Sequence, residues 1–209
     1  MPSFGKIIVS FCYATAFAVA APTTAVPRAP MCPEPGQTAR VYASALYTLF
    51  PGSPQLASQA GADFHVQWNN QTGLAIQQAI VFSGFPAEAQ GCAFGWAQDN
   101  ATEGVLVAGG DGLLTGRQLA GFPINQTGQG GISAAAVLPF DTAGPDAEFH
   151  PDFTSWDREI RGTTHTSGPG KIVCAEDIYL LFEKVHTTNG NVFLKKTDGS
   201  GVFIDYTCS

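Results

Sequence analysis

The sequence predicts an all-β protein, an antiparallel β-sandwich with long loops rich in Gly, Ala and Pro and with two disulfides. Three observations support this class. The 209 residues include 24 Gly and 14 Pro, which punctuate short strands. Several segments alternate apolar and polar side chains with the period of a strand, and few show a long helical period. Four of the five cysteines follow a predicted secretion signal, an even number that is typical of disulfide pairing.

The first twenty residues have the composition of a secretory signal. Lys6 supplies a positive charge, residues 7–19 form an apolar run, and Ala18-Val19-Ala20 is a small-residue cleavage site. The apolar run is short for a membrane span. We therefore expect a signal peptide over residues 1–20, a propeptide or N-terminal linker over 21–31, and a single β-sandwich domain over 32–209.

Cleavage of the signal removes Cys12 and leaves Cys32, Cys92, Cys174 and Cys208. In a secreted chain these four indicate two disulfides, with three possible pairings. A zinc site is the competing interpretation, but the sequence has neither a C-x-x-C pair nor a Cys–His cluster with zinc spacing. We expect no metal and no cofactor.

The stretch DFHVQW alternates most clearly, with Phe64, Val66 and Trp68 on one face and polar residues on the other. The short apolar stretches 45–50 and 73–82 are also compatible with one or two helical turns. Residues 109–170 are expected to form long loops over the sandwich. Further strands are predicted over residues 40–49, 76–83, 92–97, 104–108, 132–139, 172–185, 191–196 and 201–207.

The last three strands are predicted to form a meander, because Asn189-Gly190 is a strong hairpin signal and KTDGSG supplies the next turn. Cys174 would then begin the first strand and Cys208 would end the third, at opposite ends of the sheet and beyond bridging distance. Domain termini, in turn, often lie close together. These arguments favour Cys32 with Cys208 and Cys92 with Cys174, without excluding the other pairings.

Charge and sequons restrict the partners and the compartment. Loss of Lys6 leaves 9 Lys+Arg against 17 Asp+Glu, a net charge of −8, which disfavours nucleic acid and anionic membranes. No apolar segment after the signal is long enough to span a membrane. Asn70, Asn100 and Asn125 each begin an N-x-T sequon and are expected to carry glycans on surface loops. We expect a secreted protein, extracellular or in a cell wall.

Two stretches resemble the But-two C-terminal domain, a family widespread in secreted fungal proteins. The first is FSGFPAEAQGCAFGW, with Phe85, Pro86, Ala89, Gly91 and Cys92. The second resembles the later blocks of the family at residues 174–182 and at Gly201, Ile204, Tyr206 and Cys208. The resemblance implies a β-sandwich without established catalytic residues. It does not carry over the ubiquitin-pathway partner of the protein that gave the family its name, because a secreted chain would not meet that partner.

One constellation has the residue types of a metal or proton-transfer site. In AEFHPDF, the side chains of Glu148, His150 and Asp152 would project from one face of a strand while Phe149 and Phe153 point to the other. Pro151 favours the simpler interpretation, an edge strand with a solvated polar face. The sequence contains neither a G-x-S-x-G elbow nor an H-E-x-x-H motif.

Three functions remain, and one of them, an interaction protein delivered to a host, has the same sequence features as the first. The first is a non-enzymatic cell-surface or wall-matrix glycoprotein that binds a polysaccharide or a protein partner. For sugar stacking we nominate Trp156, with Asp157 and Glu159 as hydrogen-bond acceptors, and expect Trp68 and Trp96 in the core. The alternative is an extracellular polysaccharide hydrolase with paired carboxylates drawn from Glu148, Glu159 and Glu183. The oligomeric state is not predicted.

Overall fold

The computed structural model describes residues 31–98, 106–126, 130–154, 156, 162, 164–185 and 188–208. The predicted signal peptide and residues 21–30 lie outside this part of the chain. The predicted all-β class is confirmed, and the strands are β1 (Ala39–Tyr42), β2 (Ala45–Leu49), β3 (Ala57–Ser58), β4 (Ala60–Gly61), β5 (Phe64–Asn69), β6 (Leu74–Ser83), β7 (Ala89–Ala97), β8 (Leu106–Gly110), β9 (Leu114–Gln118), β10 (Ile132–Ser133), β11 (Thr164–Ser167), β12 (Asp177–Lys184), β13 (Gly190–Leu194) and β14 (Gly201–Cys208).

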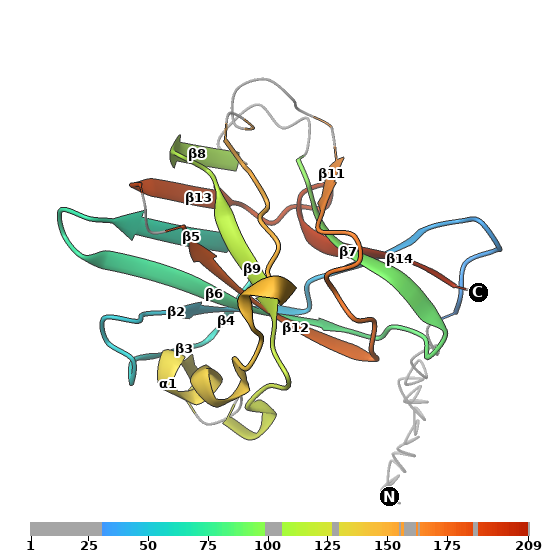
Figure 1. Cartoon of the computed structure of the whole chain (residues 1–209), viewed down its shortest axis with the longest axis horizontal. Coiled ribbons are helices and arrows are strands. Elements are labelled where there is room, and N and C mark those ends of the chain that lie inside the picture. The colour runs from blue at the N-terminus through green and yellow to red at the C-terminus, as the bar shows by residue number, and fades with distance from the viewer. Residues whose placement is uncertain are drawn as a thin grey trace, which may run out of the picture.

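The strands form two main antiparallel sheets (Figure 1). The first has the order β1-β14-β7-β11, and the second has the order β4-β2-β6-β5-β13-β8. Strand β6 is long enough to serve two neighbours along one edge: its first residues pair with β5, and residues 78–83 pair with β12, which in turn pairs with β9. The second sheet therefore divides at β6 into two wings. One wing contains β5, β13 and β8, and the other contains β2, β6, β12 and β9.

The main core lies between the two sheets and is rich in aromatic side chains. Trp96 of β7 stacks on Phe153 at a centroid distance of 4.0 Å, and Phe94 lies 4.6 Å from Phe182 of β12. Phe153 also stacks on Phe64 of β5, so the aromatic contacts join both sheets. All five rings are buried, and such contacts add to the stabilisation that their buried area provides.

A second, smaller core covers the opposite face of the β2–β6–β12–β9 wing. Along β12, Leu180 and Phe182 point into the main core, whereas Leu181 points to the other side. There it packs with residues of β2 and β6 and with Val137 of the short helix α1 (Ala134–Val137). This helix lies beside β3 at the lower left of the molecule in Figure 1. Among the described residues, no helix is long and apolar enough to cross a membrane.

Both predicted disulfides are present. Cys32 bonds to Cys208 and Cys92 bonds to Cys174, with Cα–Cα distances of 5.7 and 5.5 Å. The predicted meander of the last three strands, which was one of the two arguments for this disulfide pairing, is wrong. β12, β13 and β14 do not pair with one another. β12 pairs with β6 and β9, β13 with β5 and β8, and β14 with β1 and β7. The argument from adjacent termini holds, since β1 near the start of the domain pairs with β14 at its end.

The hairpin predicted at Asn189-Gly190 is also wrong. Gly190 is the first residue of β13 and pairs with Gly110 of β8 and Trp68 of β5. A Cβ at this position would overlap the backbone oxygen of Asp111 and the Lys184 side chain. The glycine is therefore required by close packing and not by a tight turn.

Three local predictions are corrected or resolved as well. The strand predicted over residues 132–139 is mostly helical: after β10, Ser133 caps α1 by accepting a hydrogen bond from Ala136 N, and the 3-10 helix η2 (Leu138–Phe140) follows. An Ala-rich run after a serine cap favours this outcome. The ambiguous stretches 45–50 and 73–82 belong to strands β2 and β6. Strands β9 and β11 lie within the predicted loop region.

Candidate functional site

Within residues 32–209, three long stretches of the sequence contain no Asp, Glu, Lys or Arg: residues 41–62, 64–87 and 118–140. The fold brings parts of all three together. The loop between β2 and β3 lies beside the β5–β6 turn, and together they line one shallow hollow. On its other side the same loop contacts α1, where Ala135 N donates a hydrogen bond of 2.8 Å to Pro54 O. A surface without formal charge thus extends over segments distant in sequence.

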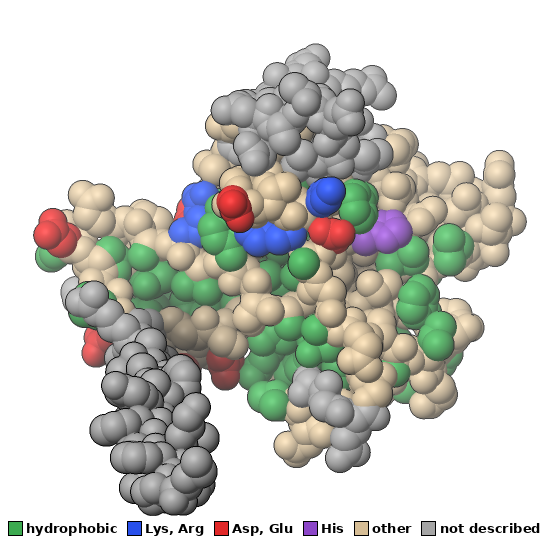
Figure 2. All heavy atoms as spheres, turned by 180° about the vertical axis from the view of Figure 1, so that it is seen from behind, with side chains coloured by type: hydrophobic (Ala, Val, Ile, Leu, Met, Phe, Trp, Pro, Cys, Tyr) green, Lys and Arg blue, Asp and Glu red, His purple; other side chains and the backbone are tan. Residues whose placement is uncertain are grey.

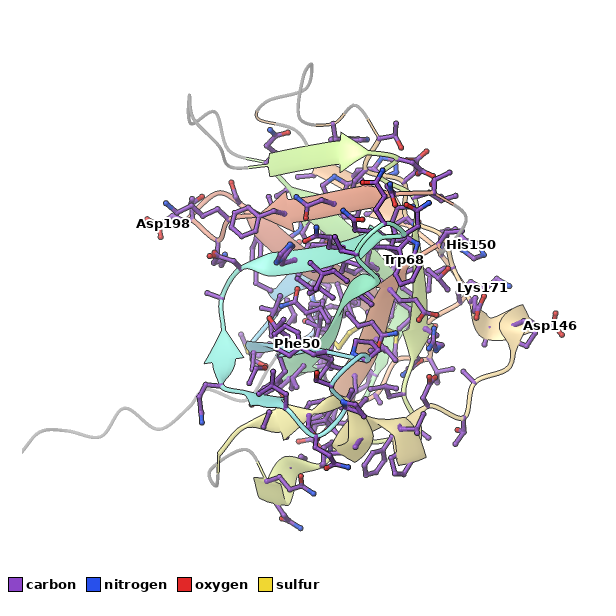
Figure 3. All side chains as sticks on the ribbon, turned by 90° about the vertical axis from the view of Figure 1, so that its left-hand side faces the viewer. Phe50, Trp68, Asp146, His150, Lys171 and Asp198 are labelled. Carbon is purple, nitrogen blue, oxygen red and sulfur yellow. A yellow bond between two sulfur atoms is a disulfide. The ribbon has the colours of Figure 1, made fainter. Side chains whose placement is uncertain are left out.

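We call this surface the neutral face and define it as residues 50–56, 70–75, 122–126 and 130–140. It carries four of the six exposed large hydrophobic side chains of the described residues, namely Leu56, Leu74, Ile124 and Leu138. In the view from behind, its region at the lower right has hydrophobic and other uncharged side chains but no blue or red ones (Figure 2). In Figure 3, Phe50 is labelled near the middle of the view, and the charged side chains of Asp146, Lys171 and Asp198 lie toward its edges. Depletion of charge is typical of the centre of an interface.

A pocket of about 390 Å³ opens on the neutral face between α1 and the sheet. Its floor is the outward face of the wing, with Gln77 of β6, Leu181 of β12 and Arg117 of β9. Its aliphatic walls come from β2 and its loop (Leu49, Pro51, Pro54) and from α1 and η2 (Ala135, Val137, Leu138). The pocket thus has aliphatic walls and one polar end.

The polar end is an ordered network centred on Arg117. Its Nε and Nη2 donate to the two carboxylate oxygens of Asp141 at 2.6 and 2.7 Å, and its Nη1 donates to Glu183 Oε1 at 2.6 Å. The other Glu183 oxygen accepts a hydrogen bond from Gln77 Nε2 at 2.7 Å. Arg117 and Asp141 close the charge-free run 118–140 at its two ends, so the ion pair also fixes the segment that forms the pocket wall.

These contacts determine the chemistry that the network can perform. Hydrogen bonding to Asp141, and then to Glu183, raises the pKa of Arg117 above its ordinary value, so the guanidinium keeps its charge. All four carboxylate oxygens of Asp141 and Glu183 accept hydrogen bonds from this cation or from Gln77. A general acid must carry a proton that it can donate. The arrangement therefore favours binding over proton transfer.

The sequence-predicted acid–imidazole group lies elsewhere, along β9. Phe149 and Phe153 point inward as predicted, and two isolated bridges hold the segment: Gly116–Phe149 to β9, and Leu113–Asp152 to the residue before β9. His150 is exposed, and its Nδ1 lies 3.4 Å from Thr115 Oγ1; Asp152 instead accepts a hydrogen bond from Thr154 N. Within the described residues, no group of three or more His, Cys, Asp and Glu side chains is placed to hold a metal ion.

The three tryptophans occupy different environments. Trp96 is fully buried in the main core, as predicted. Trp68, which was expected in the core, is only half-buried and lies outside the main core cluster, at the end of β5 (Figure 3). The stacking candidate Trp156 is half-buried, with its ring edge-on to Trp96 at 5.3 Å and 5.1 Å from the His165 ring. These contacts occupy part of the ring that a sugar would use.

The remaining predicted positions divide between described and undescribed parts of the chain. Asn70 and Asn125 are exposed, as glycan attachment requires. Asn100, Asp157 and Glu159 lie outside the described residues. Glu183 is part of the Arg117 network on the outward face of β12, and Glu148 belongs to the separate segment beside β9.

Sequence reasoning missed Arg117, Asp141 and Gln77. A signal for the first two exists, since a charge-free run of 23 residues begins directly after one and ends directly before the other. The sequence gives no comparable signal for Gln77, because its role depends on the pairing of β6 with β12.

No protein-family model matches the chain, and no curated protein matches it.

Proposed function

We propose that this protein is a secreted, non-enzymatic glycoprotein of a fungal cell surface or wall matrix, and that it binds an uncharged polysaccharide through the neutral face. The observation that carries the proposal is the assembly of three charge-free segments into one exposed surface. The two disulfides and the exposed sequons Asn70 and Asn125 are compatible with the extracellular compartment. The fungal assignment depends on the resemblance to the But-two C-terminal domain.

The composition of the neutral face suits a neutral sugar polymer. Ser53, Gln55, Gln71 and Thr72 are exposed there and can exchange hydrogen bonds with hydroxyl groups. Phe50, which is half-buried, and the exposed leucines supply apolar contact for sugar C–H groups. Because no formal charge lies within the face, we expect binding to depend little on salt.

Hydrolysis is less well supported than binding. Glycoside cleavage needs two carboxyl groups flanking the sugar bond, one of them protonated. Near the pocket, the available carboxylates are Asp141 and Glu183, and both are held by the Arg117 cation. Glu148 belongs to another segment and has no part in this network.

Retention on insoluble polymers tests the proposal. The secreted wild-type protein is incubated with chitin, β-glucan and mannan at low and at high salt, and reducing-sugar release is measured in the same tubes. Two matched variants each place a carboxylate at an exposed aliphatic position: Leu56→Glu on the neutral face and Val173→Glu away from it. We expect salt-independent retention of the wild type and of Val173→Glu, a clear loss for Leu56→Glu, and no sugar release.

Four outcomes would contradict this assignment. Equal retention of the two variants would remove the neutral face from the contact. Loss of retention in Trp156→Ala, with Leu56→Glu unaffected, would move the contact to the tryptophan. Release of sugar that is abolished by Glu148→Gln or Glu159→Gln would favour the hydrolase. Absence of any retention would leave a protein partner as the ligand of the face.

A further inference from the structure

The pocket on the neutral face has the dimensions and the lining of a small-molecule site in its own right. Its volume of about 390 Å³ lies within the usual range of about 300–1,000 Å³ for such sites. Its described lining residues include no aromatic side chain, so a stacked sugar ring is a poor occupant. Aliphatic walls formed by leucine, valine, proline and alanine side chains fit a hydrocarbon body instead.

The polar end determines which head group the pocket accepts. The network contains one positive charge, Arg117, and two negative charges, Asp141 and Glu183, which gives it a net charge of −1. Three Arg117 nitrogens and the Gln77 amide nitrogen already donate to these two carboxylates. The two carboxylates keep acceptor capacity, because a carboxylate has about four lone-pair positions and each oxygen here uses one, while two Arg117 N–H groups and one Gln77 N–H group lie outside these four bonds.

We propose that this pocket binds a small amphiphile with an aliphatic body and a protonated primary amine at one end. The ammonium group would neutralise the remaining negative charge and donate to Asp141 and to the carbonyl oxygen of Gln77, both of which line the pocket. The hydrocarbon body would lie between α1 and the outward face of the sheet, against Ala135 and Leu181. A carboxylate or phosphate head would meet the net negative charge of the network. The pocket opens on the neutral face, but this proposal is argued from the pocket lining and the Arg117 network and does not depend on polysaccharide binding.

Three probes of equal chain length test the head group. Octylamine, octanoate and 1-octanol each contain eight carbons in one unbranched chain and carry, at pH 7, a positive, a negative and no charge. Titration calorimetry of the full secreted chain should give the highest affinity for octylamine, a weaker one for 1-octanol and no detectable binding of octanoate. Because the ammonium group would lie within a few ångströms of a half-buried negative charge, we expect the affinity for the amine to be about tenfold higher than that for the alcohol.

Three variants locate the site. Ala135→Phe fills the pocket, whereas Ala136→Phe makes the same change one residue further along α1, where the side chain lines the neighbouring hollow. We expect about tenfold weaker octylamine binding only for Ala135→Phe. Glu183→Gln keeps the shape of the network and removes its excess charge, so the preference for the amine should fall to near unity while 1-octanol still binds. The unfolding midpoint of each variant shows that it remains folded.

The proposal fails if octanoate binds as tightly as octylamine, or if Ala135→Phe and Ala136→Phe bind octylamine equally well. It also fails if Glu183→Gln leaves the preference for the amine unchanged, or if none of the three probes binds. Failure here leaves the polysaccharide proposal intact, because Leu56 and Val173, which test that proposal, do not line this pocket.

Discussion

The two disulfides should contribute unequally to stability, in the order opposite to their loop lengths. Cys32 and Cys208 are 176 residues apart, and Cys92 and Cys174 are 82 apart. In the chain-entropy model, loops of these lengths are worth about 5.2 and about 4.5 kcal/mol at 25 °C. Loop length alone therefore predicts that the Cys32–Cys208 bond matters more.

The surroundings of the two bonds reverse this order. Cys92 is fully buried in the main core, so Cys92→Ala/Cys174→Ala removes core atoms as well as the cross-link, which adds about 1 kcal/mol. Cys32 is exposed, and residues 34–38 between it and β1 are exposed too. When Cys32→Ala/Cys208→Ala cuts the outer bond, this segment gains freedom in the native state, and that gain offsets part of the loss.

We therefore expect losses of about 5–6 kcal/mol for the inner pair and about 2–4 kcal/mol for the outer pair. Guanidinium unfolding followed by tryptophan fluorescence measures both, since Trp96 is buried in the native core. A loss in the outer variant that equals or exceeds the loss in the inner variant would refute the reasoning. In that case loop length, and not the location of the bond, would determine the contribution.

Three single substitutions test other parts of the fold, each by urea unfolding. Gly95→Ala should cost about 2–4 kcal/mol, because a Cβ there would overlap the Phe203 ring, and a loss below about 1 kcal/mol would contradict this packing. Asp111→Asn should cost about 1–3 kcal/mol by leaving the buried Lys184 ammonium without its carboxylate. The hydrogen bond from the Thr188 hydroxyl is the main cause that lowers the pKa of Asp111. The stabilisation that Asp111 provides is therefore present above about pH 4 and is lost as the pH falls through the pKa of the folded state. At that low pH, the stability of Asp111→Asn should approach that of the wild type. Arg117→Met should lower the free energy of unfolding by about 2–3 kcal/mol, because it leaves the carboxylates of Asp141 and Glu183 without their cation. Adding Asp141→Asn and Glu183→Gln to this variant should restore most of the lost stability.

The sequence predicted most strands because alternation is a local signal. DFHVQW became β5, with Phe64 and Val66 buried and His65 and Gln67 half-buried. β9 was missed because Gly116 interrupts its alternation where the Phe149 and Phe182 rings approach the backbone. β11 was missed because THTS is a largely exposed strand at a sheet edge and has no apolar face.

Pairing between strands could not be predicted in the same way. The meander rule assumes that strands adjacent in sequence are neighbours in the sheet, which holds often but not here. Asn189-Gly190 has the residues of a hairpin turn, yet the backbone enters a strand at Gly190 because β13 lies between β5 and β8. The Arg117 network was hidden for the same reason, since Glu183 meets Arg117 only because β12 pairs with β9.

Strand β12 shows why core and site can be altered separately. Its inward row ends at Lys184, whose side chain is fully buried and pairs with Asp111, whereas its outward row ends at Glu183 beside the pocket. Because side chains alternate, these two neighbours belong to opposite faces of the sheet. Glu183→Gln should therefore change the head-group preference of the pocket with little effect on the main core, and Lys184→Met should change stability with little effect on binding. A one-residue shift of register would instead move Glu183 into the aromatic core and Lys184 to the pocket, so the pairing of β12 with both β6 and β9 fixes the pocket as firmly as it fixes the fold.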